Sequence, residues 1–306
     1  MSEFSDRAVL VTGGAGFIGS HLVERFLSEG AAVRVIDDFS TGSRENLAPF
    51  MDRIDLHEQS ITDPAACAAA CVGVDYVPHQ AALPSVARSV ADPTATHDVS
   101  ATGTLNMLVA ANDTGVRRLV YAGSSSAYGD TPTLPKREGM ASMPRSPYAV
   151  AKLAGEHYVQ LFPHLFGLET AVLRYFNVFG PRQDPNSVYS AVIPLFINAA
   201  LRKQAPTING DGGQTRDFTY IDNVVDANLR ACTAPAEGVS GEVFNVGCGQ
   251  TYTIIETASL FSDNHVFVPE RKGEVRTTLA AIDKIKSQLG WLPKIDLDAG
   301  VKLLDE

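Results

Sequence analysis

Tyr148 and Lys152 are the two residues whose spacing first suggests chemistry. They lie four positions apart in the stretch SPYAVAKLAGEH, residues 146–157, where Ser146 can cap a helix and Pro147 fits its first position. Side chains four residues apart share one helix face, so an ammonium would stand close to a phenol. Such a pair can move a proton beside a bound cofactor, but on its own it is more often a lysine stem packed over an aromatic ring. A cofactor site elsewhere in the chain must decide between the two.

A glycine-rich stretch near the start of the chain predicts that cofactor site. In AVLVTGGAGFIGSHLVERFL, Gly13, Gly16 and Gly19 follow a hydrophobic strand and lead into an amphipathic helix. Backbone N–H groups and the N-terminus of such a helix can bind a pyrophosphate. A second strand, AVRVIDD, ends in Asp37, whose carboxylate can hold the adenine ribose hydroxyls and would repel a 2′-phosphate. We therefore predict that the chain binds NAD in preference to NADP.

Three serines follow a later predicted strand. The run RRLVYAGSSSAYG places Ser124, Ser125 and Ser126 at the carboxyl end of the sheet, where open α/β sheets bind ligands. Tyr148 follows Ser124 by 24 residues, so the strand end and the helix start can meet. A serine, a tyrosine and a lysine can move a proton to or from a sugar hydroxyl while hydride moves between carbon and nicotinamide. We expect Lys152 to lower the pKa of Tyr148, whereas Ser125 and Ser126 could simply cap local backbone.

Apolar, β-branched runs alternate with longer helical patterns over the first part of the chain. This alternation predicts βαβ crossovers and a Rossmann-type, doubly wound parallel sheet that is covered on both faces. The expected strands are 8–14, 32–38, 74–82, 117–125 and 169–176, and the expected helices are 17–30, 101–113 and the segment from 147. After residue 176 shorter elements alternate with Pro- and Gly-rich connections. We therefore expect an NAD-binding domain at 1–176 and a smaller α/β substrate-binding region at 177–306, partly interleaved with it.

Composition excludes several other kinds of function. The 306 residues are 45% hydrophobic and carry a net charge of −10, with scattered basic residues, which disfavours nucleic acid or an anionic membrane as the partner. The four cysteines form neither a CxxC nor a Cys/His pattern, so we expect reduced thiols, no metal site and a cytoplasmic protein. The N-terminus lacks a basic start followed by an apolar run, and no apolar run approaches the length of a membrane span.

Several motifs together resemble the extended short-chain dehydrogenase/reductase family. They are TGGAGFIGSHL, SSSAYG, SPYAVAKLAGE and RYFNVFGPRQDPN, and the resemblance runs from about residue 7 almost to the C-terminus. Further segments, HQAALPSVARS, AVIP, NGDGGQTRDFTYIDNVVDANL and RKGEVR, look most like UDP-N-acetylglucosamine 4-epimerases and the related UDP-glucose (UDP-galactose) 4-epimerases. The resemblance implies a redox-neutral inversion at C4 of a UDP-sugar.

By this resemblance, Tyr148 as phenolate takes the 4-hydroxyl proton while hydride leaves C4 for tightly bound NAD. Ser124 would hydrogen-bond the same oxygen, and Lys152 would hold the nicotinamide ribose. The resulting 4-keto sugar would turn about its diphosphate link and regain hydride on its other face. Relatives commonly dimerise through a helix corresponding to 102–112 and the helix from Tyr148, so a homodimer is expected.

The resemblance also assigns binding residues. Cofactor contacts fall on Gly13, Gly16, Phe17, Ile18, Gly19, Asp37, Asp38, Ser60, Ile61, Gln80, Ala81, Ala82, Ser100, Tyr148, Lys152 and Phe176. Substrate contacts fall on Ser85, Ser124, Ser125, Ser126, Tyr148, Asn177, Gln183, Ala191, Val192, Arg216, Arg271, Glu274 and Thr278. Within that set, Asn177, Arg216 and Arg271 would hold the UDP portion and Glu274 the uridine ribose. The hexose would lie against Ser85, Ser125, Gln183 and Ala191.

Four positions depart from the family pattern, the segment 251–270 is shorter than usual, and a fifth position varies with substrate within the family. Ser60 and Ser100 stand where Asp and Asn are common near the cofactor, so NAD is expected to be held less tightly. Pro78 interrupts a strand and is expected to displace its end, because proline cannot donate to a ladder. Ala281 replaces a common acidic residue. Thr278 stands where enzymes restricted to UDP-glucose and UDP-galactose carry Tyr, so it should leave room for an N-acetyl group.

Three alternatives remain. A dehydratase of this fold would carry an acidic pair where Ser125 and Ser126 stand, so dehydration is disfavoured. A UDP-glucuronate 4-epimerase or decarboxylase would need a cation or polar cluster for the sugar carboxylate, and the sequence identifies none. The third alternative is not an enzyme: the chain could be a regulatory protein that binds NAD without turnover. The intact Ser124, Tyr148 and Lys152 argue against it.

Overall fold

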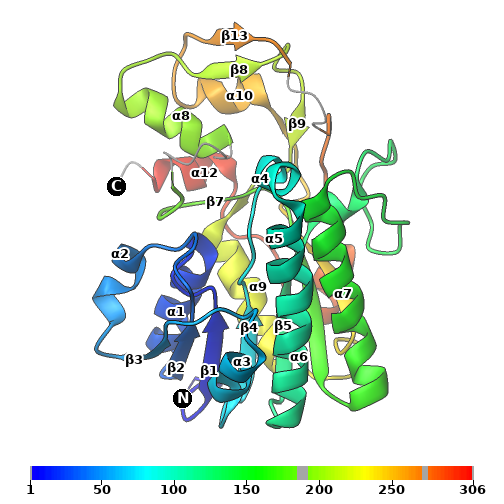
Figure 1. Ribbon diagram of the computed structural model, residues 1–306. Helices are drawn as coiled ribbons and strands as arrows, with labels where there is room; N and C mark the ends of the chain where they lie inside the picture. Colours follow the sequence, from blue (N-terminus) through cyan, green and yellow to red (C-terminus); the bar gives the residue numbers. More distant parts are fainter. Residues whose placement is uncertain (1, 185–191, 271–274, 305–306) are drawn as a thin grey trace.

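A computed structural model describes residues 2–184, 192–270 and 275–304 (Figure 1). Its centre is a seven-stranded, fully parallel sheet of mostly buried, β-branched residues. The strands are β1 (Ala8–Thr12), β2 (Ala32–Ile36), β3 (Ile54–His57), β4 (Tyr76–His79), β5 (Arg118–Ser124), β6 (Glu169–Tyr175) and β11 (Glu242–Val246). They lie in the order β11-β6-β5-β4-β1-β2-β3. The five strands expected from the sequence are confirmed, and β3 and β11 complete the sheet.

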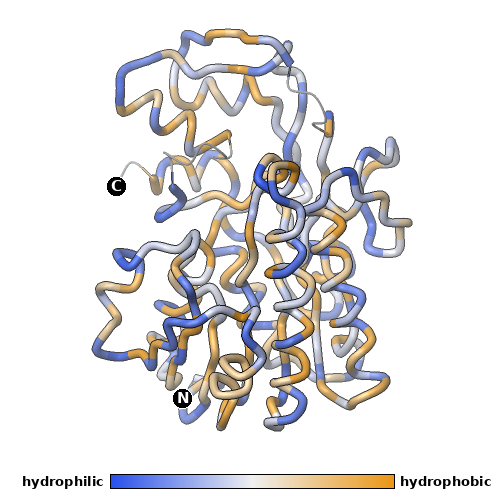
Figure 2. Tube along the Cα trace, viewed as in Figure 1, coloured by the Kyte–Doolittle hydropathy of each residue, from blue (hydrophilic) through white to orange (hydrophobic). Residues whose placement is uncertain are grey.

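Helices cover both faces of this sheet, which confirms the doubly wound fold. One face carries α1 (Phe17–Ser28), α9 (Ile221–Thr233) and α11 (Asp283–Leu289), and the other carries α3 (Pro64–Cys71), α6 (Gly103–Asp113) and α7 (Pro147–Phe166). Each layer buries its own hydrophobic cluster against the sheet. Figure 2 shows hydrophobic and hydrophilic residues alternating along α6 and α7, as expected for helices with one buried face.

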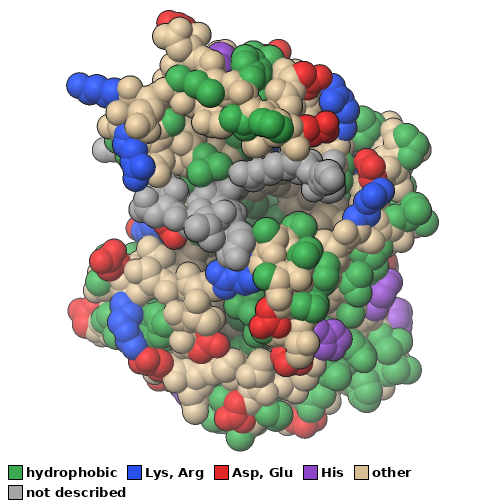
Figure 3. Space-filling view, turned by 45° about the horizontal axis from the view of Figure 1, so that its top comes forward, with side chains coloured by type: hydrophobic (Ala, Val, Ile, Leu, Met, Phe, Trp, Pro, Cys, Tyr) green, Lys and Arg blue, Asp and Glu red, His purple; other side chains and the backbone are tan. Residues whose placement is uncertain are grey.

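The remaining elements are short, and most of them lie beyond the carboxyl ends of the sheet strands (Figure 1). The strands are β7 (Val178–Phe179), β8 (Thr207–Asn209), β9 (Thr215–Arg216), β10 (Thr219–Tyr220), β12 (Tyr252–Thr253) and β13 (Val266–Val268). The helices are α2 (Arg44–Leu47), α4 (Val86–Ala91), α5 (Pro93–His97), α8 (Val192–Leu201), α10 (Ile254–Ser259) and α12 (Leu297–Lys302). Three further turns are η1 (Ala48–Phe50), the π-helical η2 (Asp98–Thr102) and η3 (Ser125–Tyr128). Figure 3 shows the surface hollowed between this upper part and the sheet domain.

The order of the strands places a ligand site between β1 and β4. After β1 the chain builds outward through β2 and β3, then returns to place β4 on the other side of β1. Ligands of open α/β sheets bind in the crevice at this reversal, outside the carboxyl ends of the strands. Although β11 and α9 come from residues after 176, they pair with β6 and pack on α1, so the second region also builds the sheet domain.

The expectation that Pro78 displaces the end of its strand is wrong. Pro78 is buried in β4 and pairs with Val120 in a register with β5 that continues through His79. On the β1 side, Tyr76 pairs with Val9 and His79 pairs with Thr12, so the register is the same before and after the proline. A proline removes a single donor, and the pairs around it are enough to hold the strand between two neighbours.

The four cysteines are all free, and none of the helices in the described residues is long and apolar enough to cross a bilayer.

Candidate active site

The loop between β1 and α1 forms a cradle of backbone. Gly13 has a φ of +65°, and a Cβ atom there would lie 2.8 Å from the N and Cα atoms of Ala81. A Cβ at Gly19 would lie 2.0 Å from the carbonyl oxygen of Gly13. Gly16 is the N-cap residue of α1 and has no side chain that could accept hydrogen bonds from the first turn. The N–H groups of that turn are therefore available to an anion. Only glycine fits these contacts, and the resulting cradle suits a pyrophosphate.

Two carboxylates stand at the end of β2. Asp37 is 8% exposed, and its Oδ2 and Oδ1 atoms accept hydrogen bonds from the N–H groups of Ala15 and Phe39, both at 2.8 Å. Burial nevertheless raises the pKa of Asp37. Burial opposes ionisation of Asp38 as well, but hydrogen bonds from Ser40 and Ser60 lower its pKa. Ser60, which replaces a common acidic residue, therefore supports the neighbouring carboxylate.

Ser100 lies in the π-helical turn η2 beside α7. It is fully buried, and its Oγ atom has no hydrogen-bond partner among the described residues. Gly155 of α7 allows this approach, because a Cβ there would lie 3.0 Å from the carbonyl oxygen of Ser100. A buried hydroxyl without a partner is costly unless another molecule satisfies it. Together with the glycine cradle and Asp37, this hydroxyl fits a bound dinucleotide.

Helix α7 begins as the sequence predicts. The Ser146 hydroxyl accepts a hydrogen bond from the N–H group of Ala149 at 3.1 Å, and Pro147 takes the first helical position. This start places Tyr148 in the first turn and Lys152 one turn later, both on the side of β5. Tyr148 is partly exposed, and Lys152 is 3% exposed.

Burial controls the protonation of this pair in the protein without ligand. It raises the pKa of Tyr148, and a hydrogen bond with Ser124 opposes that rise. Burial also lowers the pKa of Lys152 to about 7, against the attraction of Glu156. The expectation that Lys152 lowers the pKa of Tyr148 is therefore not met here. Both groups lose hydration, and a lysine with a pKa near 7 is only partly charged at neutral pH.

A hydrogen-bond network that sequence reasoning missed lies beneath Lys152. The lysine Nζ atom lies 4.2 Å from the centre of the Tyr121 ring, and the Tyr121 hydroxyl donates to the carbonyl oxygen of Lys152 at 3.0 Å. His79 lies next to Tyr121, and its Nδ1 and Nε2 atoms contact the hydroxyls of Thr12 and Thr104 at 2.7 and 3.0 Å. Burial lowers the pKa of His79 to about 3, so it stays neutral beside Lys152.

The hydrogen bonds fix the tautomer of this histidine. Thr104 donates to the carbonyl oxygen of Ser100 at 2.8 Å, so its oxygen must accept from the Nε2–H group of His79. Thr12 accepts from the N–H group of Ala81 at 3.1 Å and donates to Nδ1. The network thereby ties the ends of β1 and β4 to η2.

On the other side of the site, Asn177 and Thr278 are in direct contact. Asn177 has a φ of +31°, and its Nδ2 atom donates to the Thr278 hydroxyl at 3.0 Å and to the carbonyl oxygen of Asp217 at 2.8 Å. The N–H group of Asp217 also donates to the Thr278 hydroxyl, at 3.2 Å. Arg216 lies next to them on β9 and donates to the carbonyl oxygen of Arg276 at 3.2 Å. The structure thus brings three predicted substrate residues together.

Two buried residues that sequence reasoning missed hold this side of the site in place. The Asp217 carboxylate accepts from the N–H groups of Cys248, Gly249 and Ala280 at 2.7, 3.1 and 3.0 Å, although burial raises its pKa to about 7. The Asn245 side chain accepts from the Tyr128 hydroxyl at 2.6 Å and donates to the carbonyl oxygens of two loops. In the sequence, the position of Asp217 directly after the predicted substrate residue Arg216 was the feature that could have pointed to its role.

Other predicted residues have different surroundings. The Gln80 amide bonds with Tyr175 and Asn228, and Phe176 is fully buried against Tyr128, so neither offers a free side chain to a ligand. Ser85 holds a φ of +99°, which is strained for a residue with a side chain. Ala82, Gln183 and Val192 are partly exposed, whereas Ile61 is buried. Ala191, Arg271 and Glu274 lie outside the described residues.

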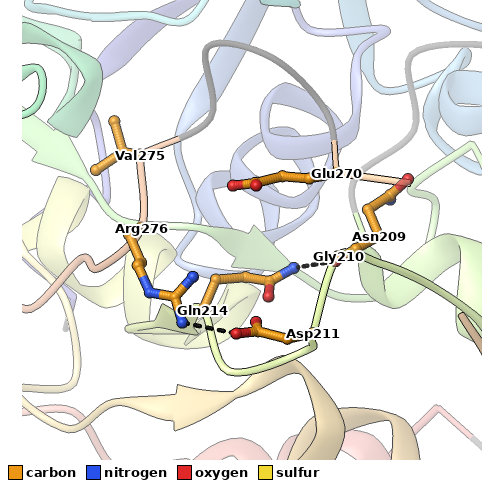
Figure 4. A pocket seen from close by; sticks show the side chains of 7 residues that line it. All are labelled: Asn209, Gly210, Asp211, Gln214, Glu270, Val275 and Arg276. Atoms are coloured by element: carbon orange, nitrogen blue, oxygen red, sulfur yellow. Dashed lines mark hydrogen bonds and ion pairs between the residues drawn. The ribbon is translucent and has the colours of Figure 1, made fainter. Parts of the chain in front are cut away.

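A polar recess of about 150 Å³ is lined by Val275 and Arg276, just before Thr278 in the chain, and by residues around Asn209 (Figure 4). Asn209 and Gln214 line it, and Arg276 forms an ion pair with Asp211 at 2.9 Å across its edge. Glu270 adds a second carboxylate. These acidic groups suit a neutral, hydrogen-bonding moiety better than a phosphate. Within the described ranges, the structure contains no group of three His, Cys, Asp or Glu side chains that could hold a metal.

The chain is similar to known proteins over nearly its whole length. The chain matches the model of the NAD dependent epimerase/dehydratase family over residues 9–247. It is 39% identical to the UDP-glucose 4-epimerase of Mycolicibacterium smegmatis over 302 residues, which cover 95% of each chain.

Two solved structures are also similar over nearly the whole chain. UDP-N-acetylglucosamine 4-epimerase from Methanobrevibacter ruminantium M1, in complex with UDP-N-acetylmuramic acid, has a TM-score of 0.90, an identity of 36% and a coverage of 98% of each chain. UDP-glucuronic acid 4-epimerase from Bacillus cereus, in complex with UDP-glucuronic acid and NAD, has a TM-score of 0.88, an identity of 30% and a coverage of 97% of each chain.

The lowered pKa of Lys152 predicts a pH dependence of stability. Above pH 7 the unfolded chain holds a lysine proton that the folded protein has released, so the free energy of unfolding of the cofactor-free protein should rise with pH from about 7 to about 10. The contribution is at most roughly 1.4 kcal/mol per pH unit. In Lys152→Met this contribution disappears, which urea unfolding at pH 7, 8 and 9 measures. The exposed Lys294→Met is the control, and equal slopes in wild type and Lys152→Met would contradict the assignment.

Proposed function

This chain belongs to the NAD dependent epimerase/dehydratase family, and its relatives include UDP-sugar 4-epimerases. We propose that it interconverts UDP-N-acetylglucosamine and UDP-N-acetylgalactosamine at C4, and the plain UDP-hexoses less well. NAD is its cofactor. The observation that carries the proposal is the placement of Ser124, Tyr148 and Lys152 at the carboxyl end of β5, next to the glycine cradle.

The proposed chemistry divides proton and hydride transfer. NAD, when bound, accepts hydride from C4 of the sugar and later returns it. Tyr148 takes the proton of the 4-hydroxyl group, and Ser124 donates a hydrogen bond to the same oxygen. In its charged form, Lys152 stabilises the phenolate, and the neutral His79 adds no positive charge that would oppose the charging of Lys152. The 4-keto sugar then turns about its diphosphate link and regains hydride at C4 on its other face, while Tyr148 returns the proton to the 4-oxygen.

Tyr148→Phe tests this function most directly. Because a positioned acid–base group is lost while the ring remains, kcat for epimerisation should fall about 10²–10⁴-fold with little change in UDP-sugar affinity. Steady-state assays with the two UDP-N-acetylhexosamines, UDP-glucose and UDP-glucuronate would measure this, while the absorbance of reduced nicotinamide is followed. Turnover close to wild type in the variant would remove the assigned role.

The same assays separate the alternatives. Net accumulation of reduced nicotinamide would indicate a dehydrogenase, and loss of carbon dioxide from UDP-glucuronate a decarboxylase. Epimerisation of UDP-glucuronate in preference to the other sugars would place the chain with the Bacillus cereus neighbour. Binding of NAD without turnover of any UDP-sugar would favour a regulatory protein.

Thr278 supports the assignment of an N-acetylated substrate. It is a small residue that accepts a hydrogen bond from Asn177, and by the family resemblance it faces the C2 substituent of the sugar, where a Tyr would fill the space. A larger side chain at this position would overlap an N-acetyl group, and such overlap can exceed the roughly 1–3 kcal/mol gained by fitting one small apolar group.

Thr278→Tyr should therefore lower kcat/KM for both N-acetylated sugars more than 10-fold and retain activity on UDP-glucose and UDP-galactose. Thr278→Val is the matched control, because it keeps the space but removes the hydrogen bonds from Asn177 and Asp217. The control should affect all four sugars alike. A parallel loss on all four in Thr278→Tyr would mean damaged packing, and inactivity of the wild type on N-acetylated sugars would remove the substrate assignment.

We further propose that the enzyme is a homodimer. The outward faces of α6 and α7 expose a stripe of large hydrophobic side chains, namely Val109, Val150, Tyr158, Leu161 and Leu165. Figure 3 shows hydrophobic and histidine side chains gathered on this flank of the molecule. A second copy would cover this stripe with its own in a two-fold, four-helix contact, since a two-fold axis brings the same surface of each copy together.

Location of the protein in the cytoplasm also stays a prediction.

Leu161→Asp should shift the protein from dimer to monomer in sedimentation velocity, because it places a charge in the middle of the stripe. Leu260→Asp, a similarly exposed leucine in the upper part of the molecule, is the control and should remain dimeric. A monomeric wild type, or a dimer that survives Leu161→Asp, would contradict this interface.

A further inference from the structure

The hydroxyl of Ser126 lies in direct contact with the Ser124 hydroxyl. Their Oγ atoms lie 2.7 Å apart, and the N–H group of Ser126 also donates to the Oγ atom of Ser124 at 3.2 Å. Tyr148 also hydrogen-bonds with Ser124. Ser126 therefore contacts a predicted catalytic residue twice.

The capacity of a hydroxyl group restricts how these bonds are arranged. Serine offers one hydrogen and two lone pairs, and the N–H group of Ser126 occupies one lone pair of Ser124. One hydrogen and one lone pair remain for two partners, Ser126 and Tyr148. If Ser124 gives its hydrogen to Ser126, it can only accept from Tyr148, which favours the neutral phenol. If Ser126 donates, the hydrogen of Ser124 is free for Tyr148.

The ionised form of Tyr148 permits only the second arrangement. A phenolate has no hydrogen to give, so Ser124 must donate to it, and the remaining lone pair of Ser124 is then filled by the hydroxyl of Ser126. We propose that Ser126 is a positioning residue: by donating to Ser124, it leaves the single hydrogen of Ser124 for Tyr148 in the free site or for the sugar oxygen when substrate is bound. Such a chain of donors polarises each member, so the outer hydroxyl strengthens the inner bond.

The turn that carries Ser126 is firmly held. The Tyr128 hydroxyl donates to Asn245 at 2.6 Å, and the N–H group of Gly129 donates to the carbonyl oxygen of Ser126 at 3.2 Å. The carbonyl oxygen of Ala127 accepts from the N–H group of Met143 at 2.9 Å. The hydroxyl of Ser126 therefore stands at a fixed place beside Ser124. Ser125, between them, has no hydroxyl contact with Ser124 among those that the structure describes.

The inference rests on the proposed epimerase function and is tested with Ser126→Ala and Ser126→Thr in the NAD-bound enzyme. Ser126→Ala should lower kcat about 3- to 30-fold near neutral pH, leave KM within about 2-fold and move the acidic limb of the kcat profile to higher pH. Ser126→Thr keeps the hydroxyl and should restore both kcat and the limb. Ser125→Ala is the matched control: it removes a predicted hexose contact, so its kcat and KM can change, but it should leave the limb in place.

A second readout does not require turnover. The difference in tyrosinate absorbance between each protein and its Tyr148→Phe counterpart reports the titration of Tyr148, which should move to higher pH in Ser126→Ala but not in Ser125→Ala. Wild-type turnover together with an unmoved limb and an unmoved titration in Ser126→Ala would overturn the role of Ser126. Failure of rescue by Ser126→Thr would also overturn it. An inactive wild type with a shifted titration would remove the proposed function but keep this role.

Discussion

The close approach of Gly13 to Ala81 is the contact on which the rest of the site depends. It occurs where the strand order of a parallel sheet reverses, so two chain segments that leave the sheet side by side must share little space. A Cβ atom at Gly13 would push the loop off β4 and close the cradle at the start of α1. Because β5 is the next strand beyond β4, the same edge also carries Ser124, and α7 then brings Tyr148 and Lys152 to it. The cofactor site and the catalytic site therefore follow from one feature of topology.

Burial decides the electrostatics at this edge. It moves Tyr148 and Lys152 toward their neutral forms, and the nearby His79 is held neutral as well. Without a ligand, the pair is thus less polar than its residue types suggest. The Ser124 hydroxyl acts against this trend because it stabilises the phenolate. The fixed hydrogen-bond network of Thr12, His79 and Thr104 keeps the region beneath Lys152 free of added charge.

The second region is tied to the first by polar groups in the interior. Asp217 collects N–H groups from two separate segments, and Asn245 joins β11 to the turn after Ser124 and to the loop around Lys136. Each side chain satisfies several backbone groups that would otherwise be buried without partners. The residues proposed to contact the sugar and those proposed to move its proton are consequently held in one rigid frame.

The amino-acid sequence by itself determined the features that depend on local pattern. Alternation of apolar runs fixed five sheet strands, the glycine spacing located the cradle, and the Ser146–Pro147 start placed Tyr148 and Lys152 on one helix face. Tertiary structure decided what depends on contacts between distant segments. Asp217 meets Ala280 across 63 positions, Thr12 meets His79 across 67, and Tyr128 meets Asn245 across 117. It also decided the protonation of Tyr148 and Lys152, because desolvation depends on everything packed around a group. Spacing along a chain predicts which side chains share a face, whereas burial and long-range partners exist only after the chain has folded.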